Sequence, residues 1–146
     1  MTLDEIFDEW TKDAKIDRAE LGNAALDIPK LHGKYYRFLV QERMMLRKYE
    51  SDLASLKENK TAWARGELDR DQLKKLGWEP KLKTVLKSDM EDFMAADKDI
   101  VQFNLMKMAP QKEKVDLLDS IIKMIANRSF QISNAINWSK FQAGAM

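Results

Sequence analysis

The sequence predicts an all-α protein built around one long central helix. Three observations support this prediction. The 146 residues include only five glycines and three prolines, apolar residues recur every three or four positions, and no run of alternating residues lies between turn signals. The length suits one domain with a modest core, and a charged content of 34% is typical of helices with large solvated faces.

The N-terminal part predicts two short helices. Leu3, Ile6 and Trp10 recur at helical spacing and indicate a first amphipathic helix. Asp17 is a suitable cap for a second helix that runs toward Leu26.

The central helix is expected between Pro29 and Ala64. Proline suits a first helical turn, and Gly66 is a suitable residue to end the helix. About 35 residues at 1.5 Å per residue give a rod of about 50 Å. Its apolar row steps by three, four or seven residues and consists of Tyr35, Leu39, Leu46, Tyr49, Leu53, Leu56 and Trp63.

Three further helices are expected after Gly66. A short one opens at Asp69 and is closed by Gly77, a second covers residues 82–108, and the last starts at Pro110 and runs to the end of the chain.

The last helix has the most regular pattern in the chain. Alternating spacings of three and four place a heptad row at Val115, Leu118, Ile122, Ile125, Ser129, Ile132 and Ile136. A second apolar row, with Phe130 and Trp138, lies on a neighbouring face. Two rows on one terminal helix favour coiled-coil-like self-association through the heptad residues. A fully buried helix in a monomeric bundle is the alternative that the pattern leaves open.

The charge is distributed unevenly along the chain. Residues 1–29 carry eight acidic and three basic residues, residues 30–87 carry fifteen basic and eight acidic residues, and the last 59 residues are nearly balanced. The basic middle indicates an anionic partner.

The sequence argues against an enzyme. It has no cysteine, His32 is its single histidine, and neither of the common phosphate-binding glycine motifs occurs. We therefore expect no catalytic residues, no metal and no cofactor. No apolar run is long enough to cross a bilayer and the N-terminus does not resemble a signal peptide, so a soluble intracellular protein without a membrane partner is expected.

The stretch "LKENKTAWARG" (56–66) combines three cations with a tryptophan. Cations that follow phosphates beside an aromatic ring that stacks on bases are typical of single-stranded nucleic-acid binding. This pattern predicts DNA contacts at Lys57, Lys60 and Arg65, with Trp63 either a stacking platform or a core residue. Further candidate DNA contacts in the basic middle are Lys34, Arg43 and Lys83.

Several short motifs, taken in order, resemble the UvsY-type recombination mediator proteins of T-even-like phages. The motifs are "IDRAEL" (16–21), "LHGKY" (31–35), "MLRKYE" (45–50), "LKENKTAWARG" (56–66), "KTVLKSD" (83–89), "RSFQI" (128–132) and "FQAG" (141–144). The basic positions that the family uses for DNA lie just before the glycine, where Glu58 here occupies or displaces one of them.

The resemblance implies a mediator that binds single-stranded DNA without sequence preference and promotes loading of a recombinase in place of the single-strand-binding protein. It further implies a ring-like homo-oligomer, with hexamer and heptamer as candidate sizes, and action in the cytoplasm of the infected bacterial host. Residues 1–109 would form the helical DNA-binding region and residues 110–146 the oligomerisation helix. The alternative is a non-enzymatic helical scaffolding or assembly protein.

Overall fold

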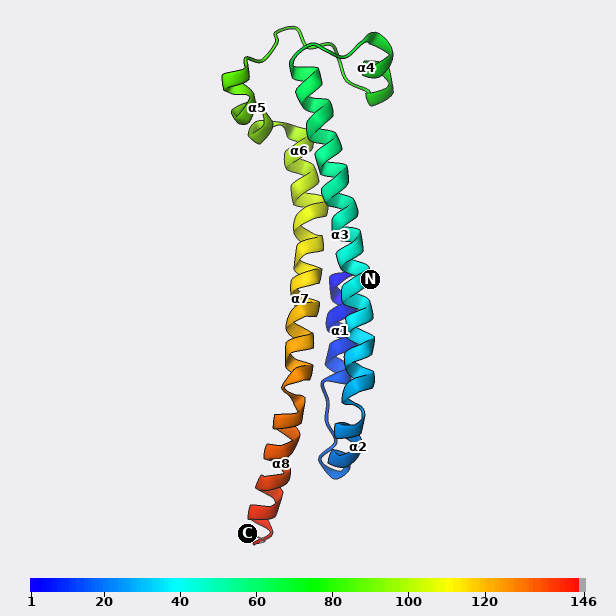
Figure 1. Cartoon of the computed structure of the whole chain (residues 1–146), viewed down its shortest axis with the longest axis vertical. Helices are drawn as coiled ribbons and strands as arrows, with labels where there is room; N and C mark the ends of the chain where they lie inside the picture. The colour runs from blue at the N-terminus through cyan, green and yellow to red at the C-terminus, as the bar shows by residue number, and fades with distance from the viewer. Residues whose placement is uncertain (145–146) are drawn as a thin grey trace. The chain divides into compact units, whose positions relative to one another are not determined.

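The computed structural model describes residues 1–144, and these residues form helices and connections without a strand, which confirms the all-α prediction. Figure 1 shows their order along the chain. The helices are α1 (Leu3–Asp13), α2 (Leu21–Leu26), α3 (Ile28–Ala64), α4 (Arg70–Leu76), α5 (Met90–Ala96), α6 (Lys98–Phe103), α7 (Ala109–Ala126) and α8 (Arg128–Gln142). Among the described residues, no helix is both long and apolar enough to span a bilayer.

The predicted long helix is confirmed as α3, which has 37 residues. It ends at Ala64, and Gly66 follows in a turn with a φ of 71° that allows the N–H of Glu67 to reach the carbonyl of Ala62 at 3.0 Å. The short helix α4 also has the predicted ends. Asp69 forms a capping box with Gln72, and Gly77 adopts a left-handed conformation with a φ of 74°.

Residues 82–108 do not form the single helix that was expected. Residues 82–86 are not helical, and the N–H of Val85 donates to the carbonyl of Ala64 at 2.9 Å instead of joining a helix. Helices α5 and α6 are then separate, and Asp97 caps α6 by accepting from the N–H of Ile100 at 3.1 Å.

The last helix also differs from the prediction, since it neither begins at Pro110 nor continues unbroken. A π-helical turn over Asn104–Met108 joins α6 to α7, so that the chain stays helical through the proline. Such a turn accommodates the missing N–H of proline. Toward the C-terminus, Asn127 separates α7 from α8.

The chain divides into two compact units. The terminal unit comprises Met1–Met45 and the described part of Gln111–Met146, and the middle unit comprises Leu46–Pro110. The functional division at residues 109 and 110 remains a prediction, and residues 145–146 of its second part lie outside the described residues.

The core of the terminal unit is built from α1, α3 and α7. Side chains from these three helices pack together because each helix is apolar along one face. The fully buried members are Ile6, Tyr35, Leu39, Leu118, Ile121 and Ile125.

Candidate nucleic-acid interface

The end of α3 in the middle unit brings together cations that are distant in sequence. The hydrogen bond from Val85 to Ala64 lays residues 83–85 beside the helix end. A Cβ added at Gly66 would lie 3.3 Å from Thr84 Cγ2, which shows how closely the two segments pass. Lys83 therefore lies at the same end of α3 as Arg65.

Three of the predicted DNA contacts are exposed in the middle unit. Lys57 lies on α3 about two turns before its end, Arg65 directly follows the helix, and Lys83 lies on the segment that passes the helix end. None of the three forms an ion pair within residues 1–144. We name Lys57, Arg65 and Lys83 the cationic cluster. Its charges are available to phosphates.

The structure places Lys60 differently from the prediction. Its side chain is only 4% exposed, and its Nζ lies 2.6 Å from Asp99 Oδ2 and 3.2 Å from Asp97 Oδ1. The same ammonium lies 4.3 Å from the ring centroid of Trp78. The ammonium of Lys60 is occupied by two carboxylates and an aromatic ring, so it is not available to bind a phosphate. We therefore do not include Lys60 among the proposed DNA contacts.

Trp63 lies in the centre of an aromatic cluster of the middle unit. Its ring centroid is 5.7 Å from that of Trp78 and 6.1 Å from that of Phe93. Its indole N–H donates to the carbonyl of Glu79 at 2.7 Å. Lys81 lies 4.8 Å from the same ring. These contacts favour the core alternative for Trp63 over the stacking alternative.

Lys34 and Arg43 belong to the terminal unit and face carboxylates there. Lys34 Nζ lies 2.6 Å from Asp13 Oδ2 and 2.8 Å from Glu9 Oε2, whereas Arg43 makes a longer contact of 3.9 Å with Asp119. Because both cations face carboxylates of their own unit, we do not include them among the proposed DNA contacts.

The Lys34 contact also changes the acidity of its partners. Burial opposes ionisation of Asp13, but the hydrogen bonds from Lys34 and from the Tyr35 hydroxyl outweigh it and lower the pKa of Asp13. Burial, reinforced by the Asp13 carboxylate, raises the pKa of Tyr35. The hydrogen bonds to Asp13 and Glu9 raise the pKa of Lys34.

The net charge of the middle unit is less positive than the net charge of residues 30–87. Residues 46–110 contain 13 Lys and Arg and 12 Asp and Glu, a net charge of +1, because the fold adds the acids of α5 and α6 to the basic stretch. An anion would therefore respond to the local cationic cluster more than to the field of the whole unit.

Half of the predicted oligomerisation residues belong to the interior of the chain itself. Leu118 and Ile125 are fully buried core residues, and Ile132 is also buried. They have no surface to offer a second subunit. Val115, Ile122 and Ile136 are only partly buried. The alternative of a buried helix thus describes much of α7. We therefore do not include Leu118, Ile125 and Ile132 among the proposed interface residues.

Helix α8 instead exposes a different set of apolar side chains. Phe130, Trp138 and Phe141 are 69%, 59% and 60% exposed. Spacings of eight and three residues place them on one side of the helix. The rings of Trp138 and Phe141 stack, with centroids 5.6 Å apart. We name these three residues the aromatic face of α8. The sequence pattern placed Phe130 and Trp138 only in a second apolar row, and Phe141 was not predicted to belong to this face.

The fold and these surfaces define a class: an all-helical protein with an exposed cationic cluster at the end of its longest helix and an exposed aromatic face on its last helix. The comparisons with known proteins agree with this description. The family model for the recombination, repair and single-stranded-DNA-binding protein UvsY matches residues 9–145. The chain therefore belongs to the UvsY family.

Solved structures show the same fold. The crystal structure of the bacteriophage T4 recombination mediator protein UvsY in lattice type II matches with a TM-score of 0.82 and 21% identity, covering 98% of each chain. The structure of the T4 protein in lattice type IV matches with a TM-score of 0.82 and 19% identity, covering 97% of this chain and 99% of that chain. No curated protein sequence matches the chain.

Proposed function

We propose that this protein is a recombination mediator that binds single-stranded DNA without sequence preference and helps a recombinase replace the single-strand-binding protein on it. Family membership supports the recombination role and the DNA ligand. The observation that supports the site is the unpaired cationic cluster, since its members can contact phosphates without reading bases. The finer elements, namely recombinase loading and a ring-like homo-oligomer, belong to the proposal.

A binding assay tests whether the cationic cluster contacts DNA. Replacing Lys57, Arg65 and Lys83 together by alanine should weaken binding to a labelled unstructured oligonucleotide. It should also reduce the magnitude of the slope of log affinity against log salt concentration by about 2. Each phosphate neutralised on a single strand contributes roughly 0.7 to that slope. Fluorescence anisotropy at several salt concentrations measures both quantities.

The terminal unit offers a matched control for this experiment. Lys12, Lys15 and Lys112 are exposed lysines of that unit without ion pairs in the described chain. Alanine at these three positions removes the same charge and should leave the salt slope nearly unchanged. Equal losses in the two triple variants would show that DNA responds to total charge, and would remove the cationic cluster from the proposal.

Assembly is proposed to use the aromatic face of α8. An exposed cluster of three aromatic side chains marks an interaction surface, and a repeated subunit would multiply a DNA site that is weak alone. Trp138→Ser with Phe141→Ser should lower the mass measured by light scattering. Val101→Ser removes an exposed apolar residue of α6 and serves as the control. An unchanged mass in the α8 variant would contradict this interface.

The mediator activity itself requires a reconstituted reaction. Single-stranded DNA covered with the phage's single-strand-binding protein should be a poor substrate for its recombinase, and adding this protein should restore filament formation and strand exchange. The cationic-cluster variant should restore little. A scaffolding protein, the alternative, would leave strand exchange unchanged at every concentration.

A further inference from the structure

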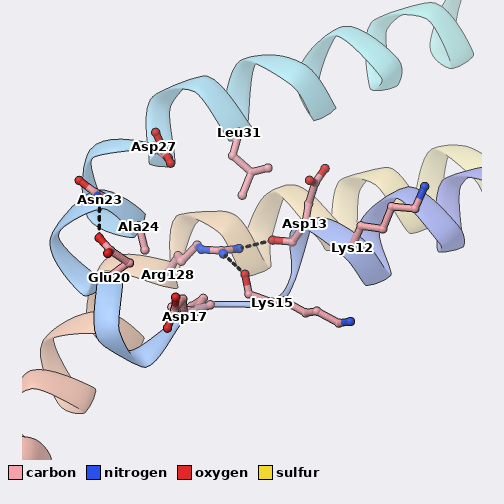
Figure 2. A pocket seen from close by; sticks show the side chains of 11 residues that line it. Lys12, Asp13, Lys15, Asp17, Glu20, Asn23, Ala24, Asp27, Leu31 and Arg128 are labelled. Carbon is pink, nitrogen blue, oxygen red and sulfur yellow. Dashed lines mark hydrogen bonds between the residues drawn. The ribbon is translucent and has the colours of Figure 1, made fainter.

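Arg128 is a buried cation at the first residue of α8. Its side chain is only 6% exposed. Figure 2 shows the guanidinium pointing from α8 toward the turn after α1, where Nη1 donates to the carbonyl of Asp13 at 3.0 Å and Nη2 donates to the carbonyl of Lys15 at 3.3 Å. One side chain thus bridges residues more than 110 positions apart in the sequence.

The bridge ends at the C-terminus of α1. The last carbonyls of a helix have no partner within the helix and carry its negative partial charge, so a cation is well placed there. Asp13 is the last residue of α1, and its carboxylate accepts hydrogen bonds from Lys34 Nζ and Tyr35 Oη of α3. Arg128 therefore fastens the start of α8 to α1, and through Asp13 to α3.

The local sequence does not enforce the break between α7 and α8. No glycine or proline occurs from Gln111 to Ala143, and these are the residues that usually break a helix. Asn127 alone separates the two helices, and its side chain caps neither. Helix α8 packs on α2 and buries Ile132, and Arg128 adds two hydrogen bonds that tie the first residue of α8 to the turn after α1.

We propose that Arg128 is the positioning residue for assembly: it sets the direction in which α8 leaves α7 and so presents the aromatic face of α8 to a second copy of the chain. This inference rests on the proposed assembly through α8. Lysine keeps the charge but lacks the two-pronged donor geometry, so it should restore the direction only in part. Methionine removes both hydrogen bonds.

Stability alone does not test this role. The Nε donor of Arg128 is buried without a partner in the described chain, and replacing a buried cation by an apolar side chain of similar size is often neutral for stability. Replacing a residue that only stabilised the unit would shift the unfolding midpoint, whereas replacing a positioning residue changes the distance between α1 and α8. The decisive measurement is therefore the distance between these two helices.

The chain has no cysteine, so spin labels can be placed at chosen sites. Exposed positions suit this purpose: Asp8→Cys on α1 and Asn137→Cys on α8. Labelled subunits are diluted in excess unlabelled protein of the same variant, and pulsed electron paramagnetic resonance gives the distribution of distances within one subunit. Lys140→Met, which removes an exposed charge from α8, is the control.

Arg128→Met should broaden and displace the distance distribution, keep the helical circular dichroism, and weaken subunit association at least about tenfold, the loss expected for charged hydrogen bonds. Arg128→Lys should be intermediate, and Lys140→Met should match the wild type. Unchanged distances in Arg128→Met, or displaced distances with undiminished assembly, would each overturn the proposal.

The Trp138→Ser, Phe141→Ser variant separates this inference from the assembly proposal. If that variant dissociates while Arg128→Met stays assembled, only the positioning role fails. If both remain assembled, the aromatic face is not the interface, and the inference about Arg128 fails with it.

Discussion

At the scale of single residues, Lys60 shows how burial changes the meaning of a basic position. In the sequence it stands among cations before a glycine, as a phosphate contact would. In the structure it is paired with Asp97 and Asp99, whose positions almost 40 residues further along give no sign of this pairing in the sequence. The exposed neighbours Lys57 and Arg65 remain proposed DNA contacts.

Lys60→Met should therefore destabilise the protein rather than abolish DNA contacts. Removing the ammonium leaves the buried Asp97 carboxylate without its partner, and breaking such a pair costs about 3 kcal/mol or more of unfolding free energy. Urea denaturation measures this loss. Lys57→Met, an exposed control, should stay within about 0.5 kcal/mol of the wild type. Equal stability of the two variants would contradict the buried pair.

The Asp13, Lys34 and Tyr35 contacts predict how stability depends on pH. The pKa of Asp13 is lowered from its ordinary value of 3.8, so its contribution is present above that value and is lost as pH falls through the folded pKa. The pKa values of Lys34 and Tyr35 are raised above 10.5 and 10.0, so their contributions are present below these values and are lost as pH rises.

Urea midpoints measured across the pH range should therefore fall below about pH 4 and above about pH 10. Asp13→Asn should make the acid limb shallower than in the wild type, because the carboxylate with the lowered pKa is gone. Asp4→Asn, at an exposed carboxylate of the same helix, serves as the control. An acid limb of unchanged steepness in Asp13→Asn would contradict the role of Asp13.

At the scale of helices, the ends that depend on local chemistry were predictable and the breaks that depend on distant contacts were not. Gly66 and Gly77 follow helix ends because glycine adopts a positive φ readily. These helix ends can therefore be predicted from the position of the glycines in the sequence. The break at Asn127 lies beside Arg128, whose hydrogen bonds reach residues near the N-terminus. The non-helical segment 82–86 is held by the hydrogen bond from Val85 to the end of α3.

Helix α7 also shows why periodicity alone did not separate interface from core. Its heptad row points into the terminal unit in part, since Leu118 and Ile125 are fully buried, as is Ile121 on a neighbouring face. A regular apolar row predicts burial but does not say whether the covering surface belongs to the same chain.

Ile121→Ala should accordingly cost about 2–5 kcal/mol of unfolding free energy, as expected for a large aliphatic side chain removed from a packed core. Met124→Ala, at an exposed position of the same helix, should change it by about 0.5 kcal/mol or less. Thermal or urea unfolding of both variants at one protein concentration makes the comparison. Similar losses would mean that Met124 is covered in solution.

At the scale of the whole molecule, the proposed DNA contacts and the proposed assembly surface belong to different compact units. The cationic cluster lies in the middle unit, and the aromatic face of α8 lies in the terminal unit. The middle unit has a net charge of only +1, so one copy should hold DNA weakly. Tight binding would then come from several copies that engage one strand together.

The most direct test of this account compares a long oligonucleotide with one short enough to contact a single subunit. The wild type should bind the long strand far more tightly than the short one, because linked sites act together. In the Trp138→Ser, Phe141→Ser variant the affinity for the short strand should be unchanged, and the advantage of the long strand should largely disappear. A long-strand advantage that survives in that variant would contradict the account.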